Sequence, residues 1–122
     1  MKTILIVDDT RTQLELITSI LRQAGFNTIE ASSSEDAKIK LGTARPDAIL
    51  LDVVLPGISG FEFCRELKQD PKTSTIPVIL CSTKSGEMDR FWGLKLGASS
   101  YISKPIDPEE LIRSHPVGQF LT

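Results

Sequence analysis

Acidic, hydroxyl and amine side chains stand at the ends of several short apolar runs. Asp8 and Asp9 end the first run, Asp52 the third, Ser82 the fourth and Lys104 the fifth. If these runs are neighbouring parallel strands, their carboxyl ends meet at one edge of a sheet, where α/β proteins bind ligands. We therefore expect these side chains to form a single site.

Carboxylates gathered in this way repel one another unless a cation joins them. Oxygen ligands suit Mg²⁺, which takes one or two carboxylates and keeps several waters. Zinc lacks donors here, because Cys81 is the nearest thiol and its side chain should alternate away from that of Ser82. The expected ion is Mg²⁺.

A carboxylate beside Mg²⁺ can also attack phosphorus and form an acyl phosphate. Such a transfer needs an ammonium group and a hydroxyl donor near the phosphoryl oxygens, roles that Lys104 and Ser82 fit. Each residue also has an ordinary reading: Asp8-Asp9 can begin a helix, Ser82 or Thr83 can cap one, and Lys104 can lie on the surface. Their meeting at one sheet edge favours the site.

Strand-like and helical patterns alternate along the whole chain. Alternation of this kind predicts an α/β fold, a doubly wound five-stranded parallel sheet with five helices. The expected strands are 3–7, 27–31, 48–51, 77–81 and 100–103. The expected helices are 12–24, one that is capped within Ser32 to Ser34 and reaches about Leu41, 61–68, 87–96 and one that starts near Pro108. That last helix should end or bend at Pro116.

The length and composition of the chain limit the classes of protein to which it can belong. A chain of 122 residues predicts one domain, and a net charge of -2 argues against direct binding to nucleic acid. Because no apolar run reaches the length of a membrane-spanning helix, we expect a cytoplasmic protein that does not enter a membrane. Cys64 and Cys81 match no metal spacing, so packed, reduced thiols are expected.

Four segments together resemble the receiver domain of two-component response regulators, over nearly the whole chain. They are Ile6-Val7-Asp8-Asp9, Leu50 to Gly60, Pro77 to Ser82 and Gly97 to Pro105. The resemblance implies a flavodoxin-like sheet in the order 2-1-3-4-5.

The same resemblance implies a role for each residue. Asp52 would be phosphorylated by a partner histidine kinase, with Lys104 paired to the phosphoryl group. Mg²⁺ would be bound by Asp9, Asp52 and the backbone carbonyl of Val54, and by Asp8 through water. The chain would be no enzyme beyond its own Mg-assisted phosphorylation and dephosphorylation.

A switch and an output surface are implied as well. The Ser82 hydroxyl would move toward the phosphoryl group as Tyr101 turns inward, and a downstream protein would dock on the fourth helix, fifth strand and fifth helix. Segments such as Trp92 to Ala98 are similar to single-domain regulators of type IV pilus twitching motility and phototaxis, with a chemotaxis-type kinase as partner. Residues 1–122 would be one receiver domain with no output domain.

Other functions remain open alongside this one. The domain could be a phosphate shuttle or sink, or the receiver part of a longer regulator. A Mg²⁺-dependent phosphatase fits less well, because such enzymes need a second acid two residues after the nucleophile. A phosphate-independent scaffold would have no use for the clustered acids.

The remaining expectations concern packing. Packing inside is favoured for Trp92, with contact at the output surface as the alternative, and His115 is expected to lie on the surface. Phe120 and Leu121 should cover apolar surface beside the fourth helix, either within one molecule or against a second one, in a monomer or weak dimer.

Overall fold

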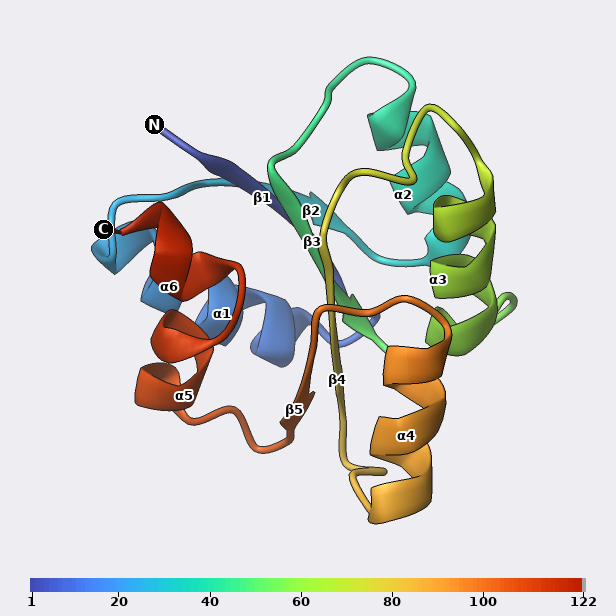
Figure 1. Cartoon of the computed structure of the whole chain (residues 1–122). Helices are drawn as coiled ribbons and strands as arrows, with labels where there is room; N and C mark the ends of the chain where they lie inside the picture. Colours follow the sequence, from blue (N-terminus) through green and yellow to red (C-terminus); the bar gives the residue numbers. More distant parts are fainter. Residues whose placement is uncertain (122) are drawn as a thin grey trace.

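Five apolar runs form a central parallel sheet in the computed structural model, which describes residues 1–121 (Figure 1). The strands are β1 (Thr3–Val7), β2 (Asn27–Ala31), β3 (Ala48–Asp52), β4 (Val78–Ser82) and β5 (Ser100–Ser103). They pair in parallel in the order β2-β1-β3-β4-β5, which confirms the predicted fold and strand order.

Helices cover both faces of this sheet. They are α1 (Arg11–Gln23), α2 (Ser34–Leu41), α3 (Gly60–Gln69), α4 (Glu87–Lys95), α5 (Pro108–Arg113) and α6 (Val117–Phe120). Figure 1 shows α1, α5 and α6 on one side of the sheet and α2, α3 and α4 on the other. The described chain thus has one helix more than predicted, and none of its helices is long and apolar enough to cross a membrane.

Side-chain alternation along the strands divides the core into two clusters. Leu5 and Val7 of β1 point to the side of α2 and α3, whereas Ile4 and Ile6 point to the side of α1 and α5. A strand covered on both faces has no position for a polar side chain until it ends. The polar residues of interest therefore lie at the strand ends.

The C-terminal segment folds back on the chain. α5 ends at Arg113, before Pro116, and α6 then places a fully buried Val117 in the core cluster of α1 and α5. The Phe120 ring lies 6.3 Å from that of Phe26. The prediction that this tail covers the surface beside α4 is therefore wrong, because burial of Val117 draws the tail to the opposite face of the sheet.

The prediction of a packed Trp92 is also wrong, because its side chain is 56% exposed. The residue that α4 turns toward the sheet is Gly93, where an added Cβ would lie 2.8 Å from the Tyr101 ring and 2.9 Å from Leu80. At this position the inner face of α4 is therefore occupied by a glycine that packs directly against Tyr101 and Leu80. Trp92 and its neighbour Phe91 are left outside with their rings stacked.

Two smaller predictions are confirmed. His115 is exposed, and Cys64 and Cys81 are both buried and unpaired. Burial raises the pKa of the Cys64 thiol to about 11 and that of Cys81 to about 12. Both thiols are therefore protonated core groups.

Candidate functional site

The ends of β1, β3 and β5 bring acidic and basic side chains together. Asp8 follows β1, Asp52 is the last residue of β3, and Lys104 follows β5. Carboxylate oxygens of Asp8, Asp9 and Asp52 lie within 4.8 Å of one another. The strand order explains this meeting, because β1 and β3 are neighbours at the centre of the sheet.

The Lys104 ammonium group bridges two of these acids. Its Nζ donates hydrogen bonds to Asp8 Oδ2 at 2.6 Å and to Asp52 Oδ2 at 3.0 Å. Asp8 is buried, and its second oxygen accepts a hydrogen bond from the amide of Thr10 at 2.9 Å. Asp9 is exposed. Of the two adjacent acids, Asp8 is thus engaged within the protein, whereas Asp9 is the solvent-exposed member of the cluster.

The cluster carries more negative than positive charge, which favours the binding of a further cation. Burial raises the pKa of Asp52, and the nearby charge of Asp8 adds to this increase, although Lys104 opposes it. Burial would lower the pKa of Lys104, but its hydrogen bonds to Asp8 and Asp52 prevail and raise it, so the lysine stays charged. In the described part of the chain, the Lys104 ammonium group pairs with two of the three clustered carboxylates, and this all-oxygen donor set fits Mg²⁺.

Val54 lies in the loop that leaves β3. Its amide donates a hydrogen bond to Asp52 Oδ1 at 3.3 Å. This contact fixes the orientation of the Asp52 carboxylate and holds the Val54 backbone beside it. The backbone amide of Val54 therefore lies next to the Asp52 carboxylate.

Ser82 is the last residue of β4, and Tyr101 lies on the neighbouring strand β5. Ser82 is fully buried, and its hydroxyl oxygen accepts a hydrogen bond from the amide of Lys84 at 3.0 Å. The Tyr101 ring is turned inward, only 7% exposed, and its hydroxyl donates to the carbonyl of Lys84. Both side chains thus hold the backbone of the same loop residue.

Two residues that matter to this site were not predicted. Gly60 lies just outside the predicted helix 61–68, yet it begins α3, and an added Cβ would lie 2.1 Å from the carbonyl oxygen of Asp52. Arg90 on α4 hydrogen-bonds to β5 and to the loop after β4. The sequence around a glycine near a turn, or around an arginine on a helix, does not predict contacts of this kind with distant segments.

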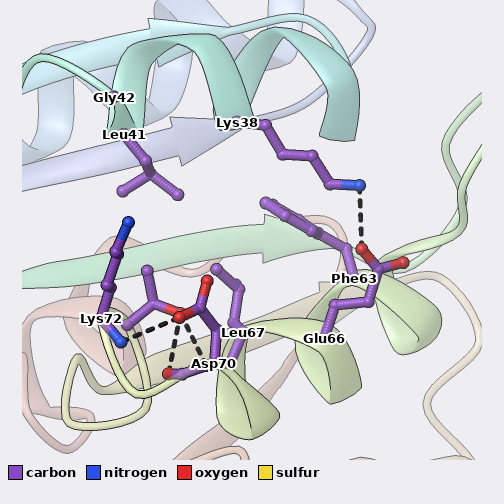
Figure 2. A pocket seen from close by; sticks show the side chains of 9 residues that line it. Lys38, Leu41, Gly42, Phe63, Glu66, Leu67, Asp70 and Lys72 are labelled. Carbon is purple, nitrogen blue, oxygen red and sulfur yellow. Dashed lines mark hydrogen bonds and ion pairs between the residues drawn. The ribbon is translucent and has the colours of Figure 1, made fainter.

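A separate cavity of about 270 Å³ lies between α2 and α3, on the flank of the sheet (Figure 2). Figure 2 shows Lys38 pointing to Glu66, and their ion pair measures 2.8 Å. Asp70, at the other end of the cavity, accepts a hydrogen bond from the amide of Lys72. The acidic cluster is not among the residues that line this cavity, so we assign the chemistry to the cluster alone.

Comparison with protein families matches residues 4–115 to the response regulator receiver domain. The chain is 40% identical over 114 residues to protein PilH of Pseudomonas aeruginosa, covering 93% of this chain and 94% of PilH. It is 44% identical over 111 residues to the phosphate regulon transcriptional regulatory protein PhoB of the same species, covering 91% of this chain but 48% of PhoB.

Two solved structures are also similar. Chemotaxis protein CheY4 of Vibrio cholerae has a TM-score of 0.88 at 27% identity, with coverage of 100% of this chain and 99% of CheY4. The receiver domain of the sensor histidine kinase PA1611 of Pseudomonas aeruginosa has a TM-score of 0.82 at 28% identity, with 92% of each chain covered. That structure holds a magnesium ion coordinated in the active site cleft.

Proposed function

Because the chain belongs to the family of response regulator receiver domains, which are phosphorylation switches of two-component systems, we propose that Asp52 is its phosphoryl acceptor. Receiver domains interact with histidine kinases, and a chemotaxis-type kinase is the proposed donor. The observation that carries the proposal is the Lys104 ammonium group, which bridges two acids that lie 96 and 52 positions away in the sequence.

The transfer is a simple exchange of bonds at phosphorus. A carboxylate oxygen of Asp52 bonds to the phosphorus of a phosphohistidine as the phosphorus–nitrogen bond breaks and the imidazole leaves. Lys104 already lies within hydrogen-bond distance of that carboxylate, so its ammonium group can donate to a phosphoryl oxygen once the group is attached. Later attack by water releases inorganic phosphate and restores the carboxylate.

For the metal, we propose that Asp9, Asp52 and the backbone carbonyl of Val54 are direct ligands of Mg²⁺ and that Asp8 acts through water. The exposed carboxylate of Asp9, which has an oxygen within 4.8 Å of oxygens of Asp8 and Asp52, supports its role as a direct ligand. Bound Mg²⁺ would neutralise charge on the phosphoryl oxygens. The ion in the PA1611 receiver domain supports the same choice of metal.

Signal output would pass through Ser82 and Tyr101 to a surface made of α4, β5 and α5. That surface has exposed apolar side chains at Phe91 and Leu94, with Trp92 beside them, and a downstream protein would dock there. The chain would be a monomer or weak dimer in the cytoplasm, a compartment that suits its two unpaired cysteines.

The proposed pathway is chemosensory control of motility. It rests on the likeness to PilH and to the chemotaxis protein CheY4, both of which this chain matches over at least 94% of their length. A phosphate shuttle or sink would use the same site chemistry. The partial coverage of PhoB shows that a domain of this kind also occurs within a longer regulator.

The test is intact mass spectrometry after incubation with acetyl phosphate and Mg²⁺. The protein is expected to gain one phosphoryl group, and a chelator should prevent the gain. A folded protein that gains nothing under any condition would instead support a phosphate-independent scaffold.

Replacing the bridging lysine should separate chemistry from metal binding. Lys104→Met is expected to slow phosphoryl uptake about 100-fold, the effect of losing one donor to developing negative charge. The same variant should bind Mg²⁺ more tightly in calorimetric titrations, because no ammonium group competes for Asp8 and Asp52. Lys72→Met, an exposed lysine in the loop after α3, is the control. Unchanged uptake by Lys104→Met would exclude the proposed role.

A further inference from the structure

Arg90, on α4, contacts three residues outside that helix through its guanidinium group. Its side chain is half-buried, and its guanidinium group donates to the carbonyl of Ser85 at 3.0 Å, to the carbonyl of Tyr101 at 3.1 Å and to Ser103 Oγ at 2.6 Å. The group also lies 5.7 Å from the centre of the Tyr101 ring. One side chain therefore joins α4, the loop after β4 and the end of β5.

These contacts reach both sides of the proposed phosphoryl site. Ser103 directly precedes Lys104, and the amide of Lys104 donates to the carbonyl of Ser82 at 3.0 Å. On the other side, Ser85 directly follows Lys84, whose amide is bonded to Ser82. Hydrogen bonds, together with the peptide links from Lys84 to Ser85 and from Ser103 to Lys104, thus connect Ser82 to Arg90 and Arg90 to Lys104.

Tyr101 belongs to the same set of contacts. Its hydroxyl donates to the carbonyl of Lys84, while Arg90 holds its backbone carbonyl and covers its ring. Gly93, on the same face of α4, leaves no space for a Cβ between the helix and that ring. A shift of α4 must therefore break contacts of Arg90 or move Tyr101, and movement of either disturbs the loop that holds Ser82.

From this arrangement we infer that Arg90 is a positioning residue that couples the phosphoryl site to α4. The inference rests on the proposed function, since it assigns the link between Asp52 phosphorylation and the output surface. Arg90 touches none of the reacting atoms. It holds the end of β5 and the loop after β4 at a fixed spacing, so that a change at Ser82 or Lys104 is transmitted to the helix.

The experiment compares amide hydrogen exchange of residues 87–95 with and without beryllofluoride and Mg²⁺, which together imitate the phosphorylated state. In the wild-type protein the additives are expected to slow exchange in α4 about 10-fold, a typical coupling between sites. In Arg90→Met the slowing should fall below about twofold. Trp92, the single tryptophan of the chain, lies on α4 and gives a second reading through its emission.

Two variants separate coupling from a general loss of contacts. Arg65→Met removes an exposed arginine of α3 that pairs with Glu62, and it should keep the full response. Arg90→Lys should respond only in part, because one ammonium group cannot reach the three acceptors that the planar guanidinium group serves. Arg90→Met itself should still gain a phosphoryl group from acetyl phosphate.

The outcomes distinguish this inference from the proposed function. If the wild-type protein binds no beryllofluoride and gains no phosphoryl group, the proposed function fails and the inference fails with it. If the wild-type protein responds and Arg90→Met responds equally, only the inference fails. Faster exchange of α4 by the same factor in both states of Arg90→Met would show a structural role alone and would also overturn it.

Discussion

Asp52→Asn is expected to abolish phosphoryl uptake from acetyl phosphate. The amide has nearly the shape of the carboxylate, but it is a poor nucleophile. Lys104 binds both Asp8 and Asp52, but only the Asp52 carboxylate also accepts a hydrogen bond from the Val54 amide. Asp8 keeps its own bond to Lys104, so the lysine retains a charged partner and the fold should persist. Intact mass spectrometry, with circular dichroism as a check of folding, measures the result.

The same strand provides a matched control. Asp47 stands at the opposite end of β3, where its carboxylate accepts a hydrogen bond from the amide of Thr3 at 2.8 Å. Asp47→Asn makes the same chemical change far from Lys104, and it should retain uptake. Phosphorylated Asp52→Asn protein would assign the acceptor to another residue, with Asp9 the first to examine because it is exposed.

A second large effect is expected at Gly60, through folding instead of chemistry. Gly60→Ala would place a Cβ 2.1 Å from the Asp52 carbonyl oxygen and 2.7 Å from Val53 Cα. These are backbone atoms, so no side chain can rotate away. We expect a loss of about 3 kcal/mol in the free energy of unfolding, measured by urea denaturation. Because the strain falls on Asp52, the folded fraction should also gain phosphoryl groups more slowly.

Gly86→Ala is the comparison for this variant. Gly86 precedes α4 with a φ of -69°, and an added Cβ would meet only Asp89 Oδ2, at 3.6 Å. The expected loss is below about 1 kcal/mol, the scale of a poorer helix cap. Equal losses in the two variants would show that general glycine effects, not the approach of α3 to β3, account for the change at Gly60.

Local sequence patterns accounted for the elements and for most of the candidate site. Ile4 to Val7 is apolar on both faces and stops at Asp8, and this pattern alone predicts a buried strand with an acid at its carboxyl end. Pro116 likewise predicts the end of α5. Such features depend on neighbours in the chain, so the sequence contains what is needed to predict them.

The two predictions that were wrong concern residues whose positions depend on contacts between distant segments. Trp92 was predicted to pack inside because large aromatic side chains favour burial, but the position of α4 is set by the close approach of Gly93 to Tyr101 and Leu80. Phe120 was assigned to the wrong face because its partner, Phe26, belongs to a distant segment. In both cases a contact across the fold outweighed a local preference.

By itself, the sequence determined the parallel α/β architecture and the placement of Asp8, Asp52, Ser82 and Lys104 at strand ends, because apolar periodicity and strand polarity are properties of short segments. Only the tertiary structure decided that Lys104 bridges Asp8 and Asp52 and that Arg90 joins α4 to β5. It also decided that α3 begins against the backbone of Asp52, where only a glycine fits. These contacts join residues far apart in the chain, and their distances follow from how the helices pack on the sheet.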